Sequence, residues 1–380
     1  MMRPRTYLDW NATAPLRPEA RAAVLDALDR VGNPSSVHAE GRCARRIIED
    51  AREKVAHLAG ARAADVVFTS SATEANNWAI RRGWRTILAS RLEHPSVMAP
   101  AQARNGALVE VPVTTDGQLD LAALARWLAD HAVDLARVPG QTLLALQAAN
   151  NETGVLQPVA EAVELAAAYG VAVLSDAVQA AGRIPLAVAG SGLRYLTISS
   201  HKLGGPLGAG ALIAGEGADL SPLLTGGGQE RGRRAGTENV VAIAGFGAAA
   251  AAAAGEIAYY GALAGLRDGL EAAVIRATPD AVVIGRGSPR LANTSCLALP
   301  GRAAETLVAA LDLGGIAVSA GAACSSGKVA PSATLAAMGF GSDIAWSAIR
   351  VSIGPSTTPE HVAAFVAAWT NITRQAARAA

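Results

Sequence analysis

The stretches Val171-Ala-Val-Leu-Ser-Asp176 and Tyr195-Leu-Thr-Ile-Ser-Ser-His-Lys202 decide the expected fold. Each is a short apolar run followed by polar residues, a pattern typical of a buried strand that ends in a turn. Similar runs, several of them separated by helical segments, occur at Val66–Thr69, Thr86–Ala89, Leu108–Val113, Leu143–Leu146 and Ala211–Ala214. Strands that alternate with helices predict a mostly parallel sheet covered on both faces. The runs Tyr195–Ile198 and Ala211–Ala214 lie close together in the sequence, which allows one antiparallel strand.

The amino-acid composition of the chain changes after Thr225. The glycine- and arginine-rich segment 226–236 leads into an alanine-rich stretch that predicts one long helix over about Asn239–Ala273. Beyond it, the pattern predicts further elements, with strands near 295–299, 317–319 and 349–353 and helices near 304–311 and 359–376. We therefore expect a second, smaller α+β domain.

Composition argues against several classes of protein. The net charge of +1 gives no electrostatic argument for binding nucleic acid or an anionic membrane. The first ten residues hold no apolar signal-peptide segment, and the run Ala248–Ala254 is too weakly hydrophobic to span a bilayer. The three cysteines lack CxxC spacing and a nearby histidine pair, which argues against a zinc site and a disulfide framework. We expect a cytoplasmic protein without a metal centre.

Lysine is rare, since the 33 basic residues comprise thirty arginines and only Lys54, Lys202 and Lys328. Unlike arginine, a lysine amine can lose its proton and act as nucleophile or base. Lys202 and Asp176 follow two expected strands, and strand ends of an open parallel sheet line its ligand crevice. A lysine Schiff base and a carboxylate for the pyridinium nitrogen are typical of pyridoxal phosphate sites. A structural salt bridge is the plainer alternative, and Lys54 is expected to pair with Asp50 on a helix surface.

Other strand ends carry candidate ligand residues. Ser71 and Glu74 form a capping-box pattern at a helix start, where free amides suit a phosphate. His94 follows another strand and is either a surface residue or an imidazole stacked on an aromatic cofactor. The segment Asn150-Asn-Glu-Thr-Gly154 predicts a turn whose amides could also reach a ligand. Arg350 lies in an alternating strand and either points to solvent or clamps a carboxylate.

Cys324 lies among small residues in Ser319-Ala-Gly-Ala-Ala-Cys-Ser-Ser-Gly-Lys328. These neighbours leave little to bury the sulfur, which suits a loop better than a core. Lys328 would favour the thiolate form of the cysteine. The plainer alternative is a small buried hydrophobe, the usual role of a free cysteine. The glycine spacing excludes a P-loop.

The order of these motifs resembles that of the cysteine desulfurases, class V of the fold-type I pyridoxal phosphate enzymes. The resemblance covers nearly the whole chain and points to the group with a Ser-x-Gly-x-Ala-Cys loop, which includes the housekeeping and nitrogen-fixation enzymes. It is carried by the motifs Asn11-Ala-Thr13, Gly32-Asn-Pro-Ser-Ser36, Ala72-Thr-Glu-Ala-Asn-Asn77, Glu93-His-Pro95, Asn150-Asn-Glu-Thr-Gly154, Asp176-Ala-Val-Gln179, Ser199-Ser-His-Lys202, Gly226–Thr237 and the Cys324 loop.

The resemblance implies a fold and a cofactor site. A mostly parallel seven-stranded sheet would form a large domain of residues 17–255, with residues 1–16 and 256–380 in a small domain. Lys202 would hold pyridoxal 5'-phosphate and move the proton, Asp176 would pair with the ring nitrogen, Gln179 with the ring oxygen, and His94 would stack on the ring. The phosphate would be bound by Ala72, Thr73, Ser199, His201 and, from the other subunit of a homodimer, Thr237.

The resemblance also implies a reaction. Asn11, Asn151 and Arg350 would bind the substrate, L-cysteine, which would be converted to L-alanine. Cys324 would take up the sulfur as a persulfide and donate it to an acceptor protein such as an iron–sulfur cluster scaffold. Alternatives within the fold are a selenocysteine lyase, a cysteine or cystine lyase and an aminotransferase. A non-catalytic subunit of a sulfur-assembly system is the alternative from another class.

Overall fold

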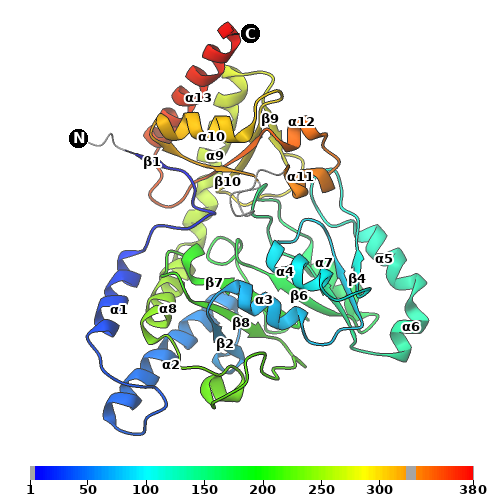
Figure 1. Ribbon diagram of the computed structural model, residues 1–380, viewed down its shortest axis with the longest axis vertical. Coiled ribbons are helices and arrows are strands. Elements are labelled where there is room, and N and C mark those ends of the chain that lie inside the picture. The colour runs from blue at the N-terminus through cyan, green and yellow to red at the C-terminus, as the bar shows by residue number, and fades with distance from the viewer. Residues whose placement is uncertain (1–4, 322–330, 380) are drawn as a thin grey trace.

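The computed structural model describes residues 5–321 and 331–379, with side chains described as far as Arg374. A seven-stranded sheet forms the centre of the larger part of the molecule (Figure 1). Its spatial order is β2-β8-β7-β6-β5-β3-β4. The strands are β2 Val66–Thr69, β3 Thr86–Ala89, β4 Leu108–Glu110, β5 Thr142–Ala145, β6 Ala172–Asp176, β7 Tyr195–Ser199 and β8 Gly210–Ala214. All pairs are parallel except those of β8 with β7 and β2, which confirms the expected sheet and its antiparallel strand.

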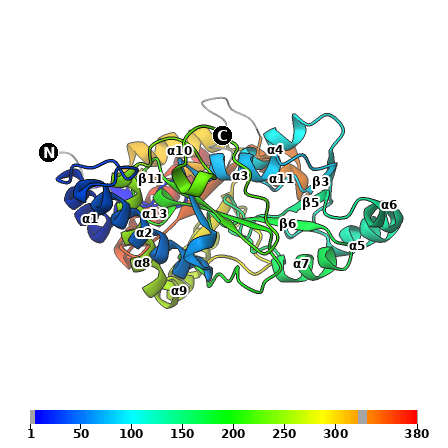
Figure 2. The same cartoon turned by 90° about the horizontal axis from the view of Figure 1, so that it is seen from below.

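The strands of this sheet are apolar along their length because both faces are covered. Successive side chains point to opposite faces, so Val66 and Phe68 pack in one core and Val67 in the other. Figure 2 shows α3 and α4 on one side of the sheet and α7 and α8 on the other. The covering helices are α2 Ala39–Ala59, α3 Ala72–Ile80, α4 Pro95–Gln102, α5 Leu121–Asp130, α7 Val159–Ala167 and α8 Val240–Gly255.

A four-stranded antiparallel sheet of order β12-β13-β10-β9 forms the smaller part of the molecule. The expected strand near 317–319 is two strands, β11 and β12, and β11 pairs in parallel with β1 near the start of the chain. The strands are β1 Thr6–Tyr7, β9 Val282–Ile284, β10 Thr294–Ala298, β11 Ile316–Ala317, β12 Ser319–Ala320 and β13 Ala348–Ser352. The remaining helices are α1 Pro18–Leu28, α6 Ala132–Arg137, α9 Ile257–Ala277, α10 Ala304–Leu313, α11 Ala333–Ala337, α12 Ser342–Ala345 and α13 Pro359–Ala379.

The prediction of one long helix over 239–273 is wrong. Helices α8 and α9 meet at Glu256 with a bend of 68°. The two helices serve different cores, because Phe246 of α8 packs in the core of the large sheet and Leu270 of α9 packs under the small one. The predicted domain boundary at residues 255–256 falls at this bend and stays a prediction. Among the described residues no single helix is long and apolar enough to cross a membrane, and only this bent pair passes, on length and composition alone.

Lys54 does not form the expected ion pair. Both Lys54 and Asp50 are exposed on α2, and no ion pair joins them among those of the described residues. The helix is instead held by its buried face, which includes Ile48 and Val55. Solvated ion pairs on a helix surface are worth only a few tenths of a kcal/mol, about 0.3–0.5, so the local pattern specifies them weakly.

Candidate active site

A cavity of about 260 Å³ opens at the carboxyl ends of the strands of the large sheet. Eleven of the thirteen residues singled out from the sequence line it: Asn11, Ala72, Thr73, His94, Asn151, Asp176, Gln179, Ser199, His201, Lys202 and Arg350. Asp176 and Ser199 end β6 and β7, whereas Arg350 lies on β13 of the small sheet and Asn11 follows β1. The cavity therefore lies where the two parts of the molecule meet, the usual place for a ligand site in such folds.

Asp176 is held by groups that sequence analysis did not single out. One of its oxygens accepts a hydrogen bond from Asn76 Nδ2 at 2.8 Å and the other from the backbone N–H of Val178 at 3.0 Å. Asn76 is fully buried, and its own oxygen accepts from the Thr197 hydroxyl at 2.7 Å. Because Asn76 lies one helical turn after Thr73 on α3, a single helix supplies both a cavity residue and the support for Asp176.

His94 is tied to the same network through Ser96. The His94 side chain caps α4, with Nδ1 3.1 Å from the backbone nitrogen of Ser96 and 2.8 Å from its hydroxyl. A backbone N–H can only donate, so Nδ1 is the acceptor and the neutral ring carries its hydrogen on Nε2. Ser96 also accepts from Asn76 at 2.9 Å. His94 lines the cavity with its ring orientation set by the helix start, and its predicted stacking on a cofactor stays a prediction.

Lys202 lies on a 3₁₀ turn directly after β7 and faces the N-terminal segment. Its Nζ donates to the carbonyl oxygens of Asn11 and Ala12, both at 2.7 Å. The neighbouring His201 has its pKa lowered to about 4 by burial and by the charge of Lys202. His201 is therefore a neutral imidazole at neutral pH, and its Nδ1 lies 3.2 Å from the Thr13 hydroxyl.

The start of α3 forms one end of the cavity. Ser71 caps the helix by accepting from the backbone N–H of Glu74 at 3.2 Å, as the capping-box pattern predicts. The Glu74 carboxylate returns to the backbone N–H of Ser70, one residue earlier than in a regular box, and pairs with Arg234. Gly210 permits this close approach, since a Cβ there would lie 2.5 Å from the carbonyl carbon of Ser71. The exposed helix amides suit an anionic group.

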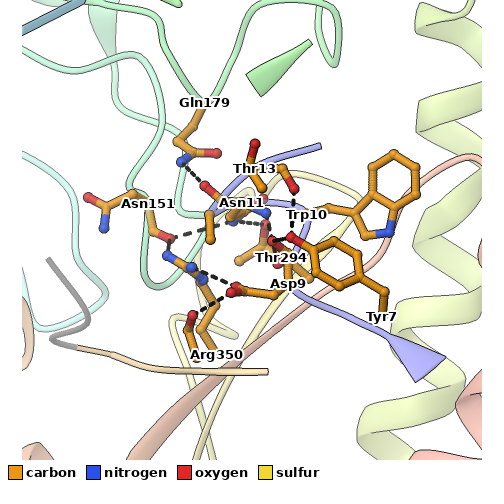
Figure 3. Close-up of polar contacts among 12 residues, drawn as sticks. Tyr7, Asp9, Trp10, Asn11, Thr13, Asn151, Gln179, Thr294 and Arg350 are labelled. Atoms are coloured by element: carbon orange, nitrogen blue, oxygen red, sulfur yellow. Dashed lines mark hydrogen bonds and ion pairs between the residues drawn. The ribbon is translucent and has the colours of Figure 1, made fainter. Parts of the chain in front are cut away.

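Arg350 does not point to solvent, so that alternative is wrong. Its side chain is 4% exposed, pairs with Asp9 at 2.8 Å and donates to the carbonyl oxygen of Asn151 at 3.0 Å (Figure 3). Its Nε is buried and has no hydrogen-bond partner among the described residues. A guanidinium with an unused N–H beside a cavity suits a carboxylate ligand.

Asn11 is fully buried, and its side-chain amide is already engaged. Nδ2 donates to the Thr294 hydroxyl at 2.9 Å, and Oδ1 accepts from Arg183 at 2.7 Å and from Asn293 at 3.1 Å. The backbone carbonyl of Asn11 accepts from Gln179 Nε2 at 3.1 Å (Figure 3). It also accepts from Lys202 Nζ. This geometry favours a supporting role for Asn11, and its predicted contact with substrate stays a prediction.

The remaining two predicted residues are Thr237 and Cys324. Thr237 lines a separate hollow with Glu230 and Arg234. Cys324 and its neighbour Lys328 lie outside the described residues. The residues that flank that segment, Gly321 and Pro331, line a cavity of about 530 Å³ that shares His94 and Asn151 with the first.

The two described cysteines are unsuited to be the sulfur acceptor that the sequence analysis predicts. Cys296 is fully buried on β10, and burial raises the pKa of its thiol far above the usual range. Cys43 lies on α2 and does not line the cavity. Neither can present a thiolate there, which leaves Cys324 as the cysteine of interest.

Comparison with known proteins shows the family to which the chain belongs. The family model described as aminotransferase class-V matches residues 6–365. The chain is 41% identical to a cysteine desulfurase of Cereibacter sphaeroides, over 94% of this chain and 93% of the relative. The chain belongs to the cysteine desulfurases of aminotransferase class V. Enzymes of this family use pyridoxal phosphate.

Further relatives support the same membership. The cysteine desulfurase IscS of Dictyoglomus turgidum is 37% identical over 94% of this chain and 92% of its own length. Among solved structures, a NifS-like protein from Rickettsia africae ESF-5 superposes with a TM-score of 0.88 at 34% identity, covering 97% of this chain and 99% of its own. The class V fold of the cysteine desulfurases thus extends over nearly the whole chain.

Proposed function

We propose that this cysteine desulfurase binds pyridoxal 5'-phosphate in the 260 Å³ cavity and converts L-cysteine to L-alanine, with the sulfur taken up by Cys324. The observation that carries the proposal is the convergence of Asp176, Lys202 and Arg350 on one cavity from separate parts of the chain. Neither a lyase nor an aminotransferase is favoured by the relatives, which are named cysteine desulfurases. An aminotransferase would also have no use for Cys324.

The residues present fit the cofactor. Asp176 would meet the ring nitrogen, and Gln179 would donate to the ring oxygen. His94 would lie against the ring, and its Nδ1 is held by Ser96. The phosphate would be bound at the start of α3 and by the polar side chains that follow β7, among them Thr73, Ser199 and the neutral His201.

Different residues of the chain would carry out the separate steps of the reaction. The bound cofactor would supply an electron sink that makes the α-proton of cysteine acidic. Lys202 would hold the cofactor and then remove that α-proton at its Nζ. Arg350, which lines the cavity, would bind the substrate carboxylate through its guanidinium while its ion pair with Asp9 stays intact.

Sulfur transfer would be carried out by Cys324. Its thiolate would attack the substrate sulfur, so that an S–S bond forms while the C–S bond breaks. The electron pair of that broken bond would stay on the carbon skeleton, which takes up protons to give alanine. The persulfide on Cys324 would then pass its outer sulfur to an acceptor protein such as an iron–sulfur scaffold.

A homodimer forms part of the proposal. Thr237 lies outside the active-site cavity of its own chain, so it could serve a phosphate only in a second copy. Large apolar side chains are exposed on α1 and the segment after it, including Leu28, Val31 and Val37. Exposed apolar side chains along this segment support an interface between subunits.

Two variants test the proposed function. Purified wild-type protein should carry visible cofactor absorbance and release alanine from cysteine, and Lys202→Ala should lose both. Cys324→Ala should keep the cofactor absorbance and form no persulfide. Pyruvate and ammonia as products would indicate a lyase instead, and full sulfur transfer by Cys324→Ala would remove that cysteine from the mechanism.

A further inference from the structure

Arg183 lies directly behind two residues of the active-site cavity. Its side chain is buried, and its Nη1 lies 2.6 Å from Gln179 Oε1 and 2.7 Å from Asn11 Oδ1. Its Nη2 lies 3.5 Å from the carbonyl oxygen of Trp10, and its Nε is buried without a hydrogen-bond partner in the part of the chain that the structure describes. Among the described residues, these acceptors are all uncharged oxygens. Arg183 is thus a buried cation that contacts the cavity wall rather than a carboxylate.

Such an arrangement is costly, because a buried charge is normally compensated by an opposite charge. Three other buried arginines follow that rule, since Arg52, Arg290 and Arg350 each pair with a carboxylate. Burial lowers the pKa of Arg183; the adjacent Tyr260 opposes this effect, and Arg350 adds to it. A cation kept under these conditions next to a predicted cofactor site needs an explanation.

Arg183 fixes the orientation of two cavity amides. A guanidinium can only donate hydrogen bonds, so the side-chain oxygens of Gln179 and Asn11 must both face it. Their nitrogens must then face away from it, Asn11 Nδ2 toward Thr294 and Gln179 Nε2 toward the Asn11 carbonyl at the cavity wall. Without Arg183, the Gln179 amide would lose the donor that holds its oxygen and could turn over, whereas Asn11 would still be held by Asn293.

We propose that Arg183 is a positioning residue that holds Gln179 with its N–H toward the cofactor's ring oxygen and places a positive charge behind that oxygen. The inference rests on the proposed function and deepens it. The same unit includes the carbonyl of Asn11, which accepts from both Gln179 and Lys202. Arg183 lies behind the cavity wall, and the charged or titratable groups that line the cavity itself are His94, Asp176, His201, Lys202 and Arg350. They are unchanged in the variants below.

The positive charge of Arg183 should shift the protonation of the bound cofactor in a direction that can be measured. A nearby cation favours the deprotonated form of any titrating group on the bound cofactor. Its removal should therefore raise the pH midpoint of the cofactor's visible absorbance. Loss of the fixed Gln179 donor should at the same time weaken cofactor binding.

The experiment compares Arg183→Met, Arg183→Lys and a matched control, Arg104→Met. Among the described residues Arg104 also has a buried Nε without a hydrogen-bond partner. It donates to the carbonyl oxygen of Trp84 at 2.8 Å, and Trp84, unlike Gln179 and Asn11, does not line the cavity. Pyridoxal phosphate dissociation constants and the pH dependence of the absorbance spectrum are measured for each. Arg183→Gln replaces the methionine variant if that variant does not fold.

Arg183→Met should bind the cofactor about tenfold more weakly, the effect of losing a hydrogen bond to a charged donor. Its pH midpoint should rise, by about one pH unit. Arg183→Lys keeps the charge and should leave the midpoint near that of wild type, and Arg104→Met should change neither quantity. Wild-type affinity and midpoint in an uncharged Arg183 variant would overturn this inference alone. A wild-type chain that takes up no cofactor would overturn the proposed function and this inference with it.

Discussion

Asp9 and Arg350 form an ion pair beside the active-site cavity, with Asp9 Oδ1 2.8 Å from Arg350 Nη2 (Figure 3). The second oxygen of Asp9 accepts from the Ser319 hydroxyl on β12 at 2.7 Å. The guanidinium is therefore fixed by a carboxylate on one side and by the Asn151 carbonyl on another. A substrate carboxylate would be the second anion on a preoriented cation, which favours binding in one pose.

The Arg350→Gln variant should no longer bind the substrate carboxylate through a guanidinium, and it leaves Asp9 without its positively charged partner. We expect kcat/KM for cysteine to fall by about 10- to 100-fold, the value of a hydrogen bond between charged groups. We also expect the free energy of unfolding to fall by about 3 kcal/mol, because one partner of a buried pair is left alone. Steady-state kinetics and urea denaturation measure the two effects separately.

Asp9→Asn is the matched second change for that experiment. In the double variant no unpaired buried carboxylate remains, so part of the lost stability should return while the kinetic defect persists. Equal stability of the single Arg350→Gln variant and the double variant would mean that the Asp9–Arg350 pair contributes nothing. A double variant with wild-type kcat/KM would remove Arg350 from substrate binding.

Asn76→Ala tests the support of Asp176. The change removes one hydrogen bond from Asp176 and leaves the buried Thr197 hydroxyl without its acceptor. We expect about tenfold weaker cofactor binding, since an unsatisfied buried group costs about 1–3 kcal/mol. Cofactor titration followed by absorbance measures it. The adjacent Asn77→Ala, which does not touch Asp176, should bind as wild type does, and an equal loss in both variants would argue for general damage to α3.

The sequence allowed prediction of those features that depend on local patterns. The buried strands of the large sheet are continuous apolar runs, and β2 and β3 have the predicted bounds. Strand ends of a parallel sheet meet at one edge, so the sequence pattern alone predicts that Asp176 and Lys202 lie close together. Much of the site followed from the resemblance, because nothing local to Arg350 or Asn11 indicates which residues they meet.

The supporting residues could not be predicted in this way. Asn76, Ser96 and Arg183 act through contacts with segments up to 173 residues away, as in the contact from Arg183 to Trp10. The sequence indicated Asn76 only weakly, because it lies one helical turn after Thr73 within the motif Ala72–Asn77. The bend at Glu256 was missed because alanine favours helix on both sides, whereas the break is imposed by two separate cores.

His201 should make stability depend on pH. Its pKa is lowered from 6.5 to about 4 in the folded chain, so the unfolded chain binds a proton that the folded chain does not. The contribution of His201 to the free energy of unfolding is fully present above pH 6.5 and is lost progressively as the pH falls toward 4. His201→Gln should therefore lose less stability than wild type between pH 7 and pH 5, as measured by urea denaturation. Parallel losses in the two proteins would contradict the lowered pKa.

Arg52 and Glu230 should stabilise the segment that carries Thr237. Both side chains are buried, at 4% and 2% exposure, and Arg52 Nη1 lies 2.7 Å from Glu230 Oε2. Glu230 and Arg231 have positive φ values of 48° and 60°, a strained conformation for residues with side chains. The ion pair and a hydrogen bond from the Phe68 backbone N–H at 2.9 Å hold Glu230 in place.

Arg52→Met should therefore lower the free energy of unfolding by about 3–5 kcal/mol, because it leaves a buried carboxylate unpaired. Glu230→Gln keeps an acceptor for the Phe68 N–H and removes the charge, so it should restore part of that loss in the double variant. Urea denaturation of the two single variants and the double variant gives the coupling energy between the side chains. A coupling near zero would show that backbone contacts, rather than this ion pair, hold the strained turn.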